Sequence, residues 1–528
     1  MSQSTEALFE RYGSGYRWLI VLMAMTSTIT AVLSATIVNV AVPEIMGSFG
    51  MDQVQAQWLA SGYLAAMTAT MLLLDYGIKT FGQRATMMFA LSAFLFGAFL
   101  GGFATNDVMM ITARFVQGAA AGIMQPMSMV AVYQVFPPER RGFAMGIYGV
   151  GAVMAPAVGP YCGGLLVDAL DWRYVFFAGV PWVLMGMLLT LLFMPSESND
   201  SGPGKKFDWP GYALVLTFIG CMLTAFADGP RDGWEDTFVV IRLTLAVALF
   251  AIFIWWQTYT PHALMNMKLY TYPSFVGATI VSVMLGLGLF GSTYLIPLFV
   301  QQVQGLTPTM SGALLLPAGF SMILLVPLTG RLADRLDPGK QVAFGLALFA
   351  FSFVLLSHAD LRTTPLTLAL WIMVSRIGMA FLFPALSAGS VRALPPKMLA
   401  QGAQSMNFTR QLGGAVGINL LAVLLQQQTD TNSLPLVATQ SPDNTATATY
   451  LSRFAEIAGP AGLSDIENTA LAMNHLSSAL HGQASAMAFS TAFEASAVAM
   501  AIALLGAGLM VKARRNRLRR EALAANQA

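Results

Sequence analysis

The chain is short of charge. Its 528 residues include 28 Lys and Arg and 26 Asp and Glu, so charged residues make up 10% of the sequence. A soluble domain typically carries about 25%. Hydrophobic residues reach 56%, and the mean hydropathy is +0.63. This composition excludes a soluble enzyme, a nucleic-acid-binding protein and a disordered chain, and it predicts a polytopic membrane protein. The net charge of +2 is too small to indicate a partner.

Cysteine and histidine are also scarce. Cys162 and Cys221 both lie in apolar runs, which predicts neither a disulfide framework nor a thiolate metal site. The four histidines fall at the ends of apolar runs or in loops: His262, His358, His475 and His481. No GxxxxGK[ST] sequence occurs, so direct use of ATP is not expected. We therefore expect no catalytic residue, no metal and no cofactor, and a membrane-embedded enzyme or sensor is disfavoured.

Long apolar runs are what the sequence has in abundance. A membrane-spanning helix needs about 20 predominantly apolar residues. Fourteen such spans are predicted, at 17–42, 54–75, 84–105, 108–135, 142–167, 173–194, 209–228, 238–258, 273–300, 309–330, 340–358, 365–389, 401–427 and 484–511. The first has no small-residue cleavage site after it, so we interpret it as a retained span rather than a removed signal peptide.

The basic residues test this count, because cytoplasmic loops carry an excess of Lys and Arg. With the N-terminus inside, twenty of the 28 basic residues fall on the cytoplasmic side, six of them in the C-terminal tail. Only five fall outside: Arg173, Arg231, Arg242, Arg362 and Arg453. Arg114, Arg376 and Arg410 fall within spans. A wrong count would mix the two sides, so the asymmetry predicts fourteen spans with both termini cytoplasmic.

Proline spacing indicates an internal repeat. Pro126 and Pro137-Pro138 are matched by Pro384 and Pro395-Pro396, both at an offset of 258 residues. The spacing predicts two related halves, the arrangement by which many transporters place a substrate site between two bundles. The predicted division is a terminus (1–16), a six-helix bundle (17–194), a linker region with two extra spans (195–272), a second bundle (273–511) containing an external loop (428–482), and a basic tail (512–528).

Small residues recur at four-residue spacing in the fifth span. Ala155, Gly159 and Gly163 share one helical face, which allows close approach of a neighbouring helix. Pro160 and Gly164 complete the sequence APAVGPYCGG. This stretch resembles the antiporter motif GxxxGPxxGG of the major facilitator superfamily, with Ala155 at the first glycine.

Other segments resemble the same superfamily. Arg114 to Gly118 read RFVQG, similar to its RxxQG motif, and Thr36 to Pro43 read TIVNVAVP, similar to the signature of its fourteen-span drug:proton antiporters. The sequences DWRYVFF (171–177) and RQLGG (410–414) match that branch too. The resemblance covers nearly the whole chain and points to EmrB/QacA-type exporters. It implies an all-α major facilitator fold of two six-helix bundles plus two extra central helices.

Two departures from the family pattern affect the mechanism. The branch normally has an aspartate two positions before the Thr of TIVNVA, and this chain has Ser34 there. That aspartate is a favoured proton-coupling residue in the family. The family's loop motif GxLADRxGR is altered in the first half, where Asp75 replaces its first Gly, Lys79 its acid, and Gly82 is kept. The second copy keeps Gly330, Asp334 and Arg335. The resemblance implies that these loops bias the conformational state.

Few ionisable residues lie within or at the ends of the spans. Glu494 and Asp75 are the only carboxylates in apolar runs, and desolvation would favour their reversible protonation. Either is a candidate for proton coupling, although Glu494 could instead reach the outer interface or pair with an arginine. Asp75 could be a gate contact at a helix end. By resemblance Arg114 faces the interior and influences protonation, and Arg376 occupies a similar place in the second half; a structural role is the alternative.

The sequence indicates the substrate cavity less directly than it indicates the membrane spans. We expect these side chains near it: Ser34, Asn39, Trp58, Tyr63, Gln117, Gln125, Tyr294, Gln301 and Arg376. The external segment 428–482 is a candidate contact for a periplasmic adaptor joined to an outer-membrane channel, or a plain tether. The tail from Lys512 to Arg520 predicts an anchor on anionic lipid.

Together these features predict a bacterial inner-membrane secondary exporter of small amphipathic toxic compounds or drugs, driven by protons and without a nucleic-acid partner. Two alternatives stay open because of Ser34. One is a dedicated exporter of a single metabolite or siderophore. The other is a facilitator that is not coupled to protons.

Overall fold

The structure is a computed structural model in which residues 5–137, 141–196, 207–391, 394–395, 398–440, 444–458 and 465–525 are described. All regular elements in these ranges are helical. Up to residue 259 the longer helices are α2 (Tyr16–Phe49), α4 (Trp58–Met71), α5 (Leu74–Gly102), α6 (Asp107–Val135), α7 (Arg141–Ala169), α9 (Val180–Phe193), α10 (Trp209–Asp232) and α11 (Thr237–Tyr259). The short helix α1 (Thr5–Tyr12) precedes them, and α3 (Gln53–Ala56) and α8 (Tyr174–Phe177) lie between them in sequence.

The remaining helices follow a short 3₁₀ segment, η3 (Met267–Thr271). They are α12 (Pro273–Gln302), α13 (Pro308–Arg335), α14 (Pro338–Ser357), α15 (Pro365–Val391), α16 (Leu399–Ala438), α17 (Thr445–Ala458) and α18 (Asp465–Ala525). Proline occupies the first turn of α12, α13 and α14, where its missing N–H is no loss. Thr307 and Asp337 cap the last two by accepting backbone N–H bonds. Local sequence thus sets these helix starts.

Twelve helices of the described chain are long and apolar enough to cross a membrane. Every predicted span overlaps a helix, but two predicted spans are not among these twelve. The span at 54–75 falls on α3 and α4, and α4 has only 14 residues. The span at 142–167 falls on α7. The structure therefore confirms an all-helical membrane protein, and the number fourteen stays a prediction.

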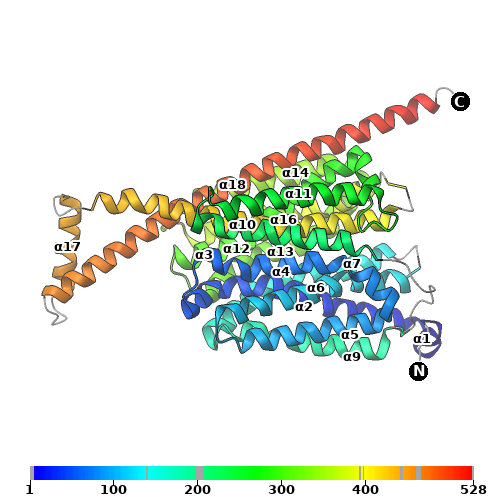
Figure 1. Cartoon of the computed structure of the whole chain (residues 1–528), viewed down its shortest axis with the longest axis horizontal. Coiled ribbons are helices and arrows are strands. Elements are labelled where there is room, and N and C mark those ends of the chain that lie inside the picture. Colours follow the sequence, from blue (N-terminus) through cyan, green and yellow to red (C-terminus); the bar gives the residue numbers. More distant parts are fainter. Residues whose placement is uncertain are drawn as a thin grey trace.

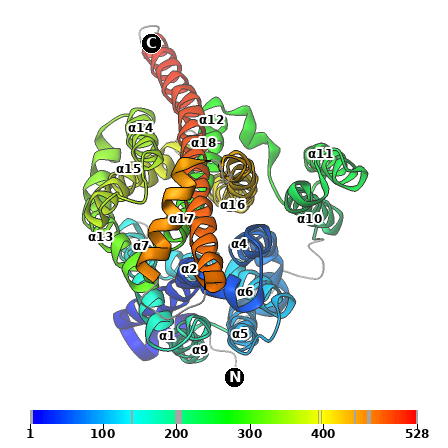
Figure 2. The same ribbon diagram turned by 90° about the vertical axis from the view of Figure 1, so that its left-hand side faces the viewer.

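The helical body has two distinct ends (Figure 1). Both termini lie at one end, which we call the proximal end, and α3 and α17 lie toward the other, the distal end. Viewed from the distal end, α13, α14 and α15 gather on one side and α4, α5 and α6 on the other, while α10 and α11 stand apart as a pair (Figure 2). The extra central helices thus lie at the edge of the body.

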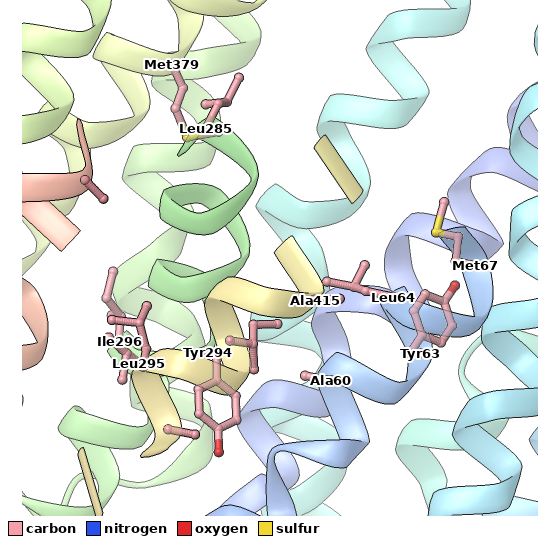
Figure 3. Packing of buried hydrophobic residues seen from close by; sticks show 14 of the residues in the cluster. Ala60, Tyr63, Leu64, Met67, Leu285, Tyr294, Leu295, Ile296, Met379 and Ala415 are labelled. Carbon is pink, nitrogen blue, oxygen red and sulfur yellow. The ribbon is translucent and has the colours of Figure 1, made fainter. Parts of the chain in front are cut away.

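The core between these groups is formed by apolar side chains from both halves of the sequence. Ala60 and Leu64 of α4 lie near Tyr294 of α12 and Ala415 of α16 (Figure 3). All four are buried. The two halves of the chain consequently share one apolar core where α4 meets α12 and α16.

The predicted external loop is largely helical. Within 428–482, α16 continues to Ala438, α17 covers Thr445–Ala458, and α18 begins at Asp465. These segments project from the distal end of the body as a protrusion (Figure 1). Tyr450 and Phe454 of α17 pack their rings against His475 of α18. The sequence predicted only an external segment here, because its many small and polar residues give a weak helical pattern.

Candidate functional site

Arg114 is the centre of a buried polar network between α2, α4 and α6. Its side chain is 0% exposed. The guanidinium Nε donates to the Leu59 carbonyl at 2.7 Å, and Nη2 donates to the Ser34 carbonyl at 3.1 Å. Nη1 donates to Ser34 Oγ and to Gln117 Oε1, both at 2.9 Å. The sequence predicted Arg114 as a proton-coupling candidate and Ser34 and Gln117 as cavity candidates, and the structure brings the three into direct contact.

Tyr63 completes this network. The guanidinium carbon of Arg114 lies 4.3 Å from the centre of its ring, a cation–π contact. The Tyr63 hydroxyl donates to the Ala31 carbonyl at 2.6 Å, which fixes the ring against α2. Gly118 permits the close packing of α6 on α4, because a Cβ at that position would overlap the Tyr63 backbone.

All of the hydrogen-bond acceptors of Arg114 in the described chain are neutral. Five cations nearer the periphery are different: Lys79, Arg173, Arg231, Arg242 and Arg514 each pair with an aspartate. A buried charge without a counter-ion is costly unless hydrogen bonds stabilise it. Ser34, standing where a carboxylate is usual in the resembling family, thus leaves this guanidinium held by neutral hydrogen-bond acceptors and by the Tyr63 ring.

Arg376 and Arg410 are two further interior arginines without a carboxylate partner in the described residues. Arg376 Nη1 contacts the sulfur of Met379 at 3.0 Å. Arg410 Nη2 donates to Asn407 Oδ1 at 2.7 Å, and its guanidinium lies 5.4 Å from the ring centre of Phe383. Both arginines are partly exposed, unlike Arg114.

Hydrogen bonds join the two halves of the chain in the distal part of the body. Asn39 Nδ2 donates to the Thr293 carbonyl at 3.2 Å, and Gln301 Nε2 donates to the Val40 carbonyl at 2.9 Å. Gln53 Nε2 donates to the Tyr294 hydroxyl at 2.6 Å. The distal parts of α2 and α12 are therefore in contact. The predicted cavity residues Asn39, Tyr294 and Gln301 are part of this interface.

The glycine-rich stretch of α7 packs closely against two helices, α2 and α13. A Cβ at Gly159 or Gly163 would press on Leu33 or Ile37 of α2, and a Cβ at Gly164 would overlap the Pro308 backbone of α13. In return, a Cβ at Gly312 of α13 would lie 2.6 Å from Tyr161 Cα. Asp168 also accepts the Thr309 N–H at 2.8 Å. The small residues allow α7 to contact α13 backbone to backbone. We call the α2–α12 and α7–α13 contacts together the distal interface.

Ala155 is buried in the same helix. Pro160 takes part in the contact between α7 and α13, because its carbonyl group faces Gly312 of α13. Both residues thus belong to the packed region of α7, as the four-residue spacing suggested.

The two candidate carboxylates lie away from this network. Asp75 is exposed at the start of α5 and pairs with Lys79. Glu494 is exposed on α18, on the same face as Val498, Ile502 and Leu505, which are exposed too. Neither contacts Arg114 in the described chain.

Other predicted positions are distributed around the body. Trp58 packs on Phe115 at the surface of the α4–α6 pair, and the Gln125 carbonyl accepts the Tyr148 hydroxyl at 3.2 Å. Gly82 has φ +79°, a conformation that favours glycine, and it bends α5 at the predicted loop. Gly330 faces Pro384, and Arg335 is exposed. The Asp334 side chain lies outside the described ones.

Three polar residues of this region were not predicted as site residues from the sequence. Gln57, directly before α4, and Ser61 of α4 are fully buried, and neither side chain has a hydrogen-bond partner among the described residues. Asn419 of α16 donates to the Leu223 carbonyl of α10 at 3.2 Å, which ties the peripheral pair to the body. A search for isolated Gln, Asn and Ser at helical spacing within apolar runs would have found them.

The fold and the site define a class of protein: a polytopic helical membrane transporter whose two sequence halves meet through a small-residue interface. Comparison with known proteins agrees, since the family model described as Major Facilitator Superfamily matches residues 24–418. The chain belongs to the Major Facilitator Superfamily, a class of membrane transporters and not of enzymes.

Relatives share about three quarters of the chain. It is 30% identical over 416 residues to "Multidrug resistance protein B homolog" of Mycobacterium tuberculosis, covering 77% of this chain and 76% of the relative. It is 28% identical over 431 residues to "Uncharacterized MFS-type transporter YhcA" of Bacillus subtilis, covering 81% and 79%. The "Lincomycin resistance protein LmrB" of Listeria innocua is 26% identical over 384 residues, covering 73% and 81%.

Among solved structures, a bacterial homologue of the human lysosomal transporter Spinster, in an inward-facing and unoccupied conformation, matches with a TM-score of 0.63. The identity is 15%, and the match covers 95% of this chain and 99% of that one. It therefore supports the fold alone.

Proposed function

We propose that this protein is a secondary exporter of amphipathic drugs or toxic compounds in the bacterial inner membrane, working by alternating access and proton antiport. The distal interface carries the proposal: α2 meets α12 through neutral hydrogen bonds, and α7 meets α13 through glycines. Contacts of this kind separate and re-form at low energetic cost, as a rocking mechanism requires. The multidrug-resistance names of several relatives support the cargo class.

The membrane arrangement that we propose has fourteen spans, with both termini cytoplasmic. The two six-helix bundles would be 17–194 and 273–511, with the extra pair α10 and α11 between them in sequence. The predicted asymmetry of basic loop residues supports this orientation. In that orientation the distal end faces outward, so the closed distal interface corresponds to a state open to the cytoplasm.

Proton coupling is the part of the proposal that Ser34 challenges. A carboxylate at this position would pair with Arg114 and could exchange a proton against cargo. The serine has no proton to exchange near neutral pH, and the other acceptors of Arg114 are neutral as well. This observation favours a second candidate function, a facilitator that moves the same cargo down its own gradient. Coupling, if it operates, then depends on a carboxylate elsewhere, and Glu494 is our candidate.

The distal protrusion is our proposed contact for a periplasmic adaptor that leads to an outer-membrane channel. Leu434 and Val437 near the end of α16, and Leu471 and Met473 near the start of α18, are exposed apolar residues. They lie outside the predicted spans, where lipid does not cover them. Exposed apolar residues of this kind favour a protein contact.

A reconstituted flux assay tests the function. Purified protein in liposomes, with an imposed pH gradient, would be followed for an amphipathic dye and for protons together. Antiport predicts dye flux that depends on the gradient and is accompanied by opposite proton flux. Dye flux without proton movement would reject antiport and support the facilitator, and absence of protein-dependent flux for a panel of amphipathic dyes would reject both.

Glu494→Gln separates the coupling residue from the fold in the same assay. If Glu494 carries the proton, the variant binds dye but loses gradient-driven flux. An unchanged ratio of protons to dye would exclude Glu494. Asp430→Asn is the matched control, because Asp430 is exposed and outside the predicted spans, and its carboxylate accepts hydrogen bonds from no described side chain other than Gln426 of its own helix.

A further inference from the structure

The interior arginines differ from several of the peripheral cations in a way that bears on the cargo. Arg376 and Arg410 have no carboxylate partner in the described chain, whereas five peripheral cations each have one. An arginine within a membrane span costs several kcal/mol and is usually paired or facing a polar pathway. Arg114 uses four of its donors on fixed acceptors and is fully buried. Arg376 and Arg410 each make one such side-chain contact within the described part of the chain, which leaves most of their donors without a described acceptor.

The placement of these two arginines points away from lipid. On α15, Arg376, Phe383 and Ser387 lie at i, i+7 and i+11 and share one face, because each residue turns the helix by about 100°. All three are partly or fully exposed. Leu366 and Leu370 form a separate exposed apolar face, about 80° and 120° from Arg376 respectively. Arg410 of α16 lies over Phe383, so it joins the first face.

We propose that Arg376 and Arg410 bind the acidic group of an amphipathic anion, so that the exported compounds are organic carboxylates, sulfonates or phosphates. This inference rests on the proposed export function. Phe383 lies about two helical turns, or 10 Å, along α15 from Arg376 and is in contact with Arg410, so it supplies an aromatic surface for the apolar part of the cargo. A guanidinium hydrogen-bonds such oxyanions in a bidentate manner. A cationic dye would be repelled by the same two charges.

Binding to the purified protein tests this class directly. The probes are 8-anilinonaphthalene-1-sulfonate, an anionic amphipath, and rhodamine 6G, a cationic one. We expect the anion to bind more tightly to the wild type, and Arg376→Gln or Arg410→Gln to weaken it by about tenfold each, which is the effect of one lost charge-assisted hydrogen bond. Arg376→Lys should keep part of the affinity. Arg362→Gln, in an exposed distal loop, is the charge-matched control.

The outcomes separate this inference from the proposed function. Equal affinity for both dyes, or loss of both dyes in the Arg376→Gln and Arg410→Gln variants, would overturn the anion assignment even if export proceeds. Selective anion binding without flux in liposomes would uphold the assignment and reject the export proposal.

A second, independent site lies at the proximal end between α14 and α18. A cavity of about 610 Å³ is lined there by the three cations Lys340, Lys512 and Arg515, and by the apolar side chains of Leu504, Ala507 and Val511. The three cations have no ion pair among the described residues, although the adjacent Arg514 pairs with Asp337 at 3.4 Å. Gly508, also in the lining, leaves its face of α18 open.

We infer that this cavity binds the headgroup of an anionic phospholipid. Cations above an apolar crevice between membrane helices match a phosphate and the start of an acyl chain. A free phosphate would use the cations but not the apolar floor formed by Leu504 and Ala507 of α18 and Ala343 of α14. The lipid would hold the α14–α18 contact at the membrane surface, and Arg514 would fix the helix end beside it.

Thermal unfolding of the full-length protein in detergent tests the site, with phosphatidylglycerol, phosphatidylcholine or inorganic phosphate added. We expect phosphatidylglycerol alone to raise the Tm, and Lys340→Gln/Lys512→Gln/Arg515→Gln to remove most of that shift. The control Arg11→Gln/Lys268→Gln/Arg331→Gln removes three exposed cations outside the cavity lining and should keep it. An equal shift with phosphatidylcholine or phosphate, or an unaltered shift in the first variant, would overturn the assignment.

Discussion

The contact between α7 and α13 offers the sharpest test of the mechanism. A Cβ added at Gly312 would lie 2.6 Å from both the Pro160 carbonyl carbon and Tyr161 Cα. Carbon atoms in good contact are about 3.5–4.0 Å apart. Because the obstructing atoms are backbone, the Gly312→Ala change requires the two helices to separate by about 1 Å.

The cost follows from overpacking, which typically destabilises a close contact by about 1–3 kcal/mol. If the distal interface forms in one state and opens in the other, this cost falls on the closed state alone. The ratio of open to closed molecules should then rise by about 5- to 150-fold, since 1.4 kcal/mol corresponds to a factor of ten. Gly220→Ala on α10 is the matched control, because a Cβ there meets no atom within 4 Å.

The assay is labelling of a single cysteine at Thr293 by a membrane-impermeant maleimide, in protein whose Cys162 and Cys221 are replaced by alanine. Thr293 is buried and its carbonyl accepts from Asn39 in the closed interface. Gly312→Ala should accelerate labelling, and Gly220→Ala should leave it unchanged. Equal labelling rates in a folded Gly312→Ala protein would refute the assignment of this contact as a gate.

Three further predictions concern the Arg114 network and α5. Ser34→Ala removes an acceptor of Arg114 Nη1 and should lower the free energy of unfolding by about 1–3 kcal/mol; an unaltered Tm would contradict the network. Ser34→Asp should restore a carboxylate beside Arg114 and increase proton flux per dye, whereas unchanged coupling would show that position 34 is not involved. Gly82→Ala forces alanine into a positive-φ conformation that is nearly exclusive to glycine (φ 79°, ψ 165°) and should destabilise by about 1–3 kcal/mol, measured as a Tm decrease that Gly220→Ala, at a helical glycine with no atom near its Cβ position, does not share.

Much of the architecture was predictable, because length and hydropathy determine membrane helices almost residue by residue. The predicted spans at 273–300 and 365–389 differ from α12 and α15 by two residues or fewer at each end. The span at 54–75 was harder to judge. Its helix is broken near Gln57 and Leu72, so α4 is shorter than a hydropathy run suggests.

The site was predictable in part. Arg114, Gln117 and Ser34 were selected by a motif resemblance, and the structure joins them. The pairing of Gln53 with Tyr294 was not foreseeable, because it connects residues 241 positions apart through the packing of the two halves. The exposure of Glu494 was also hidden, since a helix that is apolar all round gives no sign of which face meets its neighbours.

The central claim is that the distal interface opens and closes to move cargo. Asp168 accepts the Thr309 N–H at 2.8 Å. Spin labels at positions 168 and 309 would report the opening of this interface as a change in distance, measured by pulsed electron paramagnetic resonance in liposomes. The account predicts one short distance in the closed state and a second, longer distance that gains population when cargo and a pH gradient are supplied. A single short distance under every condition that sustains transport would contradict it.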